Sequence, residues 1–185
     1  MKRKVIIFSA PSGSGKSTVV NHLMGKCPEL ELSISATSRA PRGTEQNGVE
    51  YYFLTNEEFE RRIAADEFVE YEQVYKGVYY GTLKSELERI WAAGHIIAFD
   101  VDVKGGVHLK QIFGDDALSV FIKAPSVEVL RERLIKRATD SPEAIAERVA
   151  KATAELEYEP QFDYVLVNDD LATCLAEAEG LLDKY

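Results

Sequence analysis

The sequence has few cysteines and histidines, and residues of neither type are grouped. The two cysteines, Cys27 and Cys174, lie far apart in a chain of 185 residues. They indicate free thiols in a reducing compartment, not a disulfide framework. The three histidines, His22, His95 and His108, do not have the spacing of metal ligands. A disulfide-stapled secreted domain and a zinc site are therefore not expected.

The chain also lacks an excess of basic residues and any long apolar run. It has 22 Lys and Arg against 31 Asp and Glu, a formal net charge of −9. This balance argues against a nucleic-acid partner, although a few focused cations can still hold a phosphate. No run approaches membrane-spanning length, and the first apolar run is too short for a signal peptide. We expect a cytoplasmic protein with no nucleic-acid or membrane partner.

A phosphate-binding loop is the strongest motif present. The segment 10–18 reads APSGSGKST, after the apolar run Val5-Ile6-Ile7-Phe8 and before a helical pattern. The alternative is a Gly/Ser-rich turn with a chance lysine, but the strand before and the helix after favour the motif. Ala10 replaces the first glycine of the motif, which requires a negative φ there. The residues expected to hold nucleotide phosphates are Ser12, Gly13, Ser14, Gly15, Lys16, Ser17 and Thr18, with Ser17 also a Mg²⁺ ligand.

Strand-like and helical patterns alternate along most of the chain. Strands are predicted at 5–9, 32–36, 95–100, 118–122 and 164–167, and helices at 83–93, 103–113, 127–137, 142–157 and 171–184. Such alternation is typical of a parallel sheet covered on both faces, with ligands at the carboxyl ends of its strands. Ser9, Asp100 and Asn168 lie at such ends.

The stretch from about 37 to 82 interrupts this alternation and indicates a small inserted subdomain. Residues 50–53 and 68–71 predict short antiparallel strands, with a helix over 56–65 between them. Arg39 and Arg42, beside a Pro/Gly turn, suit bidentate phosphate binding, and the Tyr51 and Tyr80 hydroxyls could add donors. Because basic loops are common, this cluster alone is weak evidence for a phosphate site. The phosphate loop in the same chain makes the evidence stronger.

Three acids and one helical hairpin complete the candidate features. Asp100 and Asp102 follow a predicted buried strand, where a carboxylate could hold Mg²⁺ through water or accept hydrogen bonds from the N–H groups of a base. The alternative is that both are solvated loop acids. Glu70, if it faces a pocket, could pair with the two adjacent N–H donors of guanine. Residues 131–149 carry arginines on two predicted helices and suggest a closing lid, the alternative being a solvated charged face.

Taken together, the motifs resemble those of the guanylate kinase family over nearly the whole chain. The phosphate loop fits, and the segment SATSRAPRGTEQNGVEYYF (35–53) is similar to the family's GMP-binding signature. The segments YYGT (79–82), DVDVKG (100–105) and VNDDL (167–171) follow in the family's order.

The resemblance implies a role for each candidate residue. Ser35, Glu70, Thr82 and Asp102 would recognise guanine, and Arg39, Arg42, Tyr51 and Tyr80 would hold the GMP phosphate, with Glu45 supporting Arg42. Asp100 would lie near the metal and the nucleotides. Arg133, Arg137 and Arg148 would be lid arginines, and Asn168 would contact the adenine end of ATP. The catalytic set would be Lys16, Arg42, Arg137 and Arg148, with Ser17 and Asp100 serving Mg²⁺.

The resemblance also implies a fold and a reaction. The fold would be an α/β P-loop kinase with a five-stranded parallel core sheet flanked by helices (1–36, 83–130 and 150–185), an inserted mixed α+β GMP-binding subdomain (37–82) and a helical lid (131–149). The enzyme would transfer the γ-phosphoryl group of MgATP to GMP or dGMP without a general base. Alternatives are a non-catalytic phosphopeptide-binding module of the same fold and a P-loop kinase for another acceptor. A regulatory GTPase is not expected, because no N-K-x-D motif occurs.

Overall fold

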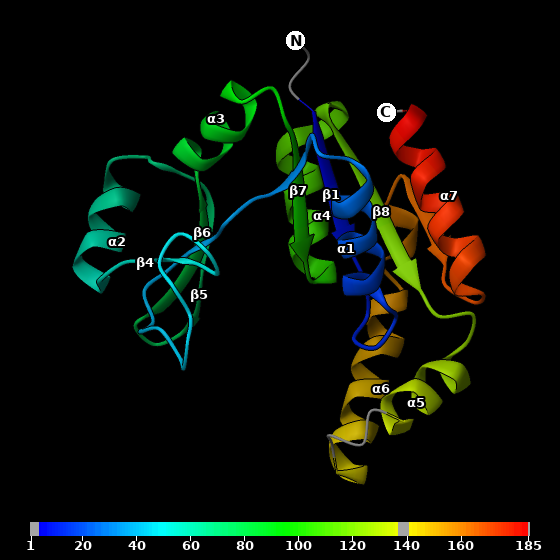
Figure 1. Cartoon of the computed structure of the whole chain (residues 1–185). Coiled ribbons are helices and arrows are strands. Elements are labelled where there is room, and N and C mark those ends of the chain that lie inside the picture. The colour runs from blue at the N-terminus through cyan, green and yellow to red at the C-terminus, as the bar shows by residue number, and fades with distance from the viewer. Residues whose placement is uncertain (1–3, 137–140, 185) are drawn as a thin grey trace. The chain divides into compact units, whose positions relative to one another are not determined.

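The computed structural model describes residues 4–136 and 141–184 (Figure 1). Its strands are β1 (Val5–Ser9), β2 (Leu30–Leu32), β3 (Ala36–Thr37), β4 (Tyr52–Phe53), β5 (Phe68–Tyr75), β6 (Val78–Leu83), β7 (Ile96–Val101), β8 (Ala117–Lys123) and β9 (Tyr164–Val167). Its α-helices are α1 (Lys16–Lys26), α2 (Asn56–Ala64), α3 (Lys84–Ala92), α4 (Val103–Phe113), α5 (Val127–Lys136), α6 (Pro142–Leu156) and α7 (Leu171–Lys184). Short 3₁₀ helices span Gly114–Asp116 and Glu159–Gln161. None of the described helices combines the length and the apolar character that a membrane span requires.

The chain divides into two compact units, which are described separately. The first unit comprises residues 31–97, and the second comprises 2–30 together with 98–185. The chain has an α/β fold with a sheet dominated by parallel strands, as expected from the sequence. The order of the five-stranded sheet is β2-β7-β1-β8-β9, and that of a separate four-stranded sheet is β4-β3-β6-β5.

The second unit is built on the parallel strands β1, β8 and β9. Every residue of β1 is buried, as expected for a strand whose sheet carries helices on both faces. The helices α1 and α7 pack against each other, and α4 packs on β1 and β8 (Figure 1). The phosphate loop therefore leaves the sheet at the end of a rigid, fully covered strand.

The helices α5 and α6 pack against each other through an apolar seam. Leu130 and Leu134 of α5 are buried against Ala152 of α6, and Ile145 and Val149 pack on this cluster. Ser141 caps α6, because its hydroxyl accepts from the Ala144 N–H at 3.2 Å. The two predicted helices are thus confirmed over the described residues, while 137–140, between them, lie outside these.

The first unit has a mixed sheet with a small aromatic core. The strand β5 pairs antiparallel with β6, and β6 pairs antiparallel with β3. Phe59 of α2 stacks on Phe68 with ring centroids 4.4 Å apart. Gly81 lets β5 and β6 approach closely, because a Cβ there would lie 2.7 Å from the Glu70 carbonyl oxygen.

Two sequence predictions for this region are wrong. The single strand predicted at 32–36 is two strands in different sheets, because the Ile34 N–H donates to the Glu86 carboxylate at 3.0 Å instead of to a neighbouring strand. The strand at Tyr52–Phe53 does not pair antiparallel with 68–71: it runs parallel to β3, and β5 pairs instead with β6, which was not predicted.

Candidate nucleotide sites

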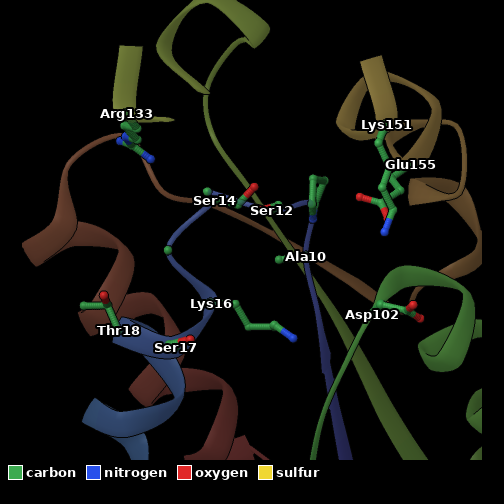
Figure 2. A pocket seen from close by; sticks show the side chains of 13 residues that line it. Ala10, Ser12, Ser14, Lys16, Ser17, Thr18, Asp102, Arg133, Lys151 and Glu155 are labelled. Carbon is green, nitrogen blue, oxygen red and sulfur yellow. The ribbon is translucent and has the colours of Figure 1, made fainter. Parts of the chain in front are cut away.

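The phosphate loop connects β1 to α1 and lines a cavity of about 530 Å³ (Figure 2). Gly13 and Gly15 have φ values of 90° and 91°, which suit glycine. Ala10 is not among the described residues with a positive φ. This agrees with the prediction that an alanine at this position requires a negative φ. The loop contributes Ala10, Pro11, Ser12, Gly13, Ser14, Gly15, Lys16, Ser17 and Thr18 to the cavity wall.

The loop lysine is held at the end of β7. The Lys16 ammonium donates to the Val101 carbonyl at 2.8 Å and forms an ion pair with Asp100. Both side chains keep partial access to solvent. A bound phosphate could therefore take up Lys16 without a core rearrangement.

Asp102 is both a helix cap and a cavity residue. Its carboxylate accepts from the Gly105 N–H at 2.8 Å at the start of α4, and it also lines the phosphate-loop cavity. The sequence prediction of a ligand-facing acid did not include this capping contact. An aspartate directly before a helical pattern, as Asp102 is before Val103, is typical of such a cap.

The two described arginines of the predicted lid have different partners. Arg148 of α6 donates to the Ser12 hydroxyl at 3.3 Å, so it meets the phosphate loop directly. Arg133 of α5 lines the cavity and donates to the Asn168 carbonyl at 2.8 Å. Arg137, the third predicted lid arginine, lies outside the described residues.

Asn168 is buried behind the phosphate loop. Its side-chain amide donates to the Ser14 carbonyl at 2.9 Å. The motif alone did not indicate this contact with the loop. The contact with the adenine end of ATP stays a prediction.

Two cavity residues were not predicted from the sequence. Lys151 and Glu155 of α6 line the phosphate-loop cavity, across the loop from Arg133 in Figure 2. The Lys151 ammonium lies 3.5 Å from a carboxylate oxygen of Glu155. The Glu155 side chain is only 10% exposed. Their spacing from Arg148, at three and seven positions, places all three on one helix face and could have identified them.

In the first unit, Arg39 is the centre of a second cluster. Its guanidinium makes two hydrogen bonds to the Glu45 carboxylate, at 2.7 and 2.8 Å, one to the Tyr80 hydroxyl at 3.0 Å and one to the Ala40 carbonyl at 2.9 Å. It also lies 5.0 Å from the centroid of the Tyr51 ring, which meets the Tyr80 ring edge-to-face. The structure thus brings together Arg39, Tyr51 and Tyr80 as the sequence suggested.

The expected support of Arg42 by Glu45 is made through the backbone. The Arg42 N–H donates to the Glu45 carboxylate at 2.8 Å, whereas the guanidinium bound by Glu45 is that of Arg39. The hydrogen bonds from Arg39 and from the Arg42 backbone lower the pKa of Glu45 to about 2. Arg42 is exposed, where an anion can reach it.

Glu70 and Thr82 face each other across β5 and β6. The Thr82 hydroxyl donates to the Glu70 carboxylate at 2.7 Å, and the two residues are paired in the strand register. Ser35 precedes β3, where its carbonyl accepts from the Tyr52 N–H at 2.9 Å. Of the four residues expected to recognise guanine, three therefore lie in the first unit and Asp102 in the second.

A buried acid, Glu86, organises the rest of this unit. Its carboxylate accepts from the Ile34 N–H, the Tyr52 hydroxyl at 2.8 Å and the Arg89 guanidinium at 3.0 Å. Burial raises the pKa of Glu86, but the bonds from Arg89, Ile34 and Tyr52 outweigh it, so the pKa is lowered. Because its partners are all supplied by the protein, Glu86 is structural.

Comparisons with known proteins agree on one family. The family model described as guanylate kinase matches residues 2–185. A guanylate kinase of Porphyromonas gingivalis is 59% identical over 183 residues, covering 98% of this chain and 97% of that protein. One of Bacteroides fragilis is 54% identical over 182 residues, covering 98% and 89%. A crystal structure of guanylate kinase from Anaplasma phagocytophilum matches with a TM-score of 0.70 at 28% identity, covering 98% of this chain and 85% of that one.

Proposed function

Since the chain belongs to the guanylate kinase family and is an ATP:GMP phosphotransferase, we propose that residues 37–82 bind GMP and that the phosphate-loop cavity binds MgATP. The observation that supports this assignment is that each unit has its own cluster of a cationic side chain with further hydrogen-bond donors, which is suited to an anion. Arg39 with Tyr51 and Tyr80 forms one, and Lys16 with the loop amides forms the other. Two phosphate sites suit transfer between two phosphorylated molecules.

In the GMP site, Arg39 and Arg42 hold the phosphate and Glu45 fixes the arginine that it binds. Glu45, the Ala40 carbonyl and the Tyr80 hydroxyl take up four of the five guanidinium N–H groups of Arg39 and fix its direction. One N–H on Nη2 is then left for the phosphate. Glu70 accepts from guanine N1–H and the 2-amino group, and Thr82 holds its carboxylate in place. Ser35 is the further base contact proposed in this unit. For Asp102, which lies in the second unit, the role in base recognition rests on the family resemblance alone. We also propose dGMP as an acceptor, since these residues are assigned to the base and the phosphate.

In the ATP site, the oxygen donors suit Mg²⁺. Ser17 offers a hydroxyl at the cavity wall, and Asp100, already paired with Lys16, would act through water. Among the described residues there is no group of three or more His, Cys, Asp or Glu side chains that could hold a metal ion. Phosphate oxygens and waters, which Mg²⁺ prefers, would supply further ligands. The ion would neutralise charge on the β- and γ-phosphates.

The reaction needs alignment and charge neutralisation more than proton transfer. The acceptor phosphate has a second pKa of ~6 and is already a nucleophile near neutral pH. Lys16, Arg42, Arg137 and Arg148 stabilise the charge on the transferring group, and Arg133 supports the nucleotide site from α5. Residues 131–149 form the lid that excludes water as a competing acceptor. The kinase identity of the relatives supports this function over a phosphopeptide-binding module.

Hydrogen exchange tests the assignment of the two nucleotides. GMP alone should protect amides in 37–82, and a bisubstrate analogue linking adenosine to guanosine through phosphates should also protect 10–18 and 131–149. Protection of 37–82 by ATP alone, or of only the phosphate loop by the analogue, would contradict it.

A further inference from the structure

Asn168 is a junction between three segments of the second unit. Its backbone N–H donates to the Lys123 carbonyl at the end of β8, at 2.8 Å. Its carbonyl accepts from Arg133 of α5, and its side-chain amide donates to the Ser14 carbonyl in the phosphate loop. The residue is 6% exposed, so these contacts are made with little competition from water.

The approach of Asn168 to the loop depends on Gly15. A Cβ on Gly15 would overlap the Asn168 side-chain nitrogen. Glycine at this position therefore serves the positive φ of 91° and also leaves room for the amide behind the loop.

The contact with Ser14 determines the direction of an N–H group. In a trans peptide the carbonyl and the following N–H point in opposite directions, and none of the described peptides is cis. When Asn168 holds the Ser14 carbonyl at the rear of the loop, the Gly15 N–H of the same peptide is directed away from Asn168. This orientation favours an anion, because amide hydrogens and not carbonyl oxygens then face it.

We propose that Asn168 is a positioning residue for phosphoryl transfer, which holds the Ser14–Gly15 peptide so that its N–H faces the ATP phosphates. Arg133 assists by fixing the Asn168 backbone from α5. The inference rests on the proposed binding of ATP in the phosphate-loop cavity. It differs from a contact between the Asn168 side chain and adenine, because the side-chain amide acts on the loop.

Two near-isosteric variants test the donor. Asn168→Leu removes the amide, and Asn168→Asp replaces it by a carboxyl group that can donate only when protonated. At pH 8.5 both should lower kcat/KM for ATP by at least ~10-fold, the effect of one buried hydrogen bond, with KM for GMP within about twofold. Burial raises the pKa of the introduced carboxyl, whereas the adjacent Arg133 lowers it, and we expect burial to dominate.

The pH profile separates positioning from a general loss of structure. Each variant is compared with the wild type at the same pH and at a temperature where circular dichroism shows it folded. From pH 8.5 to 6.0 the relative kcat/KM of Asn168→Asp should rise at least about threefold, while that of Asn168→Leu stays constant. A flat profile for Asn168→Asp, or parallel profiles for both variants, would overturn the proposal.

A second nucleotide distinguishes the loop from the base. ITP carries the same triphosphate as ATP with a different base edge, so Asn168→Leu should weaken both by the same factor within about twofold. A loss confined to ATP would assign Asn168 to adenine recognition instead. Protection of 10–18 by ATP in the wild type tests the ATP site itself, so its failure is distinguishable from failure of this inference.

The wild-type protein offers a test that needs no variant. The side-chain amide protons of Asn168 should exchange slowly by NMR, and should remain protected when a non-hydrolysable ATP analogue binds. Rapid exchange in either state would contradict a persistent bond to Ser14.

Discussion

Lys16 of the phosphate loop is ion-paired with Asp100, the acid near the carboxyl end of β7. The same ammonium donates to the neighbouring Val101 carbonyl. The lysine is therefore oriented before a nucleotide arrives, and the rotamer entropy of a free lysine does not have to be lost on binding.

Replacing Lys16 should abolish most catalysis and leave the fold intact. Lys16→Met should lower kcat at least ~10²-fold, as expected for loss of one electrostatic donor to the transition state. Lys26→Gln removes the same charge from the end of α1 and serves as the control. Activity of Lys16→Met within about threefold of wild type, measured by ADP release, would rule out a catalytic phosphate loop.

The Glu70–Thr82 pair predicts a selective effect on one substrate. Glu70→Gln keeps the shape of the side chain but removes the charge that favours two guanine N–H donors, so KM for GMP should rise much more than KM for ATP. Steady-state kinetics with each substrate varied in turn measure this. An equal rise in both constants would assign Glu70 a general structural role.

The Glu45–Arg39 contact predicts a pH dependence of stability. The pKa of Glu45 is about 2 in the folded protein, below its ordinary value of ~4.3. A depressed pKa contributes stability that is fully present above ~4.3 and is lost as the pH falls toward 2. The Tm difference between wild type and Glu45→Gln should therefore shrink between pH 5 and pH 2.5. A difference that is constant over this range would contradict the ion pair.

Lys151 and Glu155 predict a non-additive pair of substitutions. Lys151→Gln leaves the nearly buried Glu155 carboxylate unneutralised beside a polyanion, and should raise KM for ATP at least about threefold. Adding Glu155→Gln should restore most of the loss, whereas Glu147→Gln, at an exposed position of the same helix, should change nothing. A double variant worse than Lys151→Gln would refute this charge balance.

The sequence predicted the second unit better than the first. The phosphate loop and strands β1, β8 and β9 follow from apolar runs that sheets covered on both faces require. In the first unit the alternating segment around Ile34 suits a strand locally, but a hydrogen bond to the distant Glu86 interrupts it. The alternation of apolar and polar residues cannot predict a hydrogen bond to a residue so far along the chain.

The sequence predicted which kinds of residue form the candidate sites better than it predicted their hydrogen-bond partners. Arginines beside tyrosines indicate an anion site, yet only the structure assigns the Glu45 carboxylate to the Arg39 guanidinium. Likewise, Asn168 follows a strand at the expected sheet edge, but its bond to Ser14 joins residues 154 positions apart. Contacts of this kind depend on tertiary packing and leave no local pattern.

The most direct test of the account is ATP-dependent phosphorylation of a panel of GMP, dGMP, AMP, CMP and UMP, read out as the diphosphate formed. GMP and dGMP should be preferred by roughly 10³-fold or more in kcat/KM, because other bases leave the recognising carboxylates without their N–H partners. Comparable turnover of AMP and GMP would contradict the assignment of Glu70 and Asp102 to guanine.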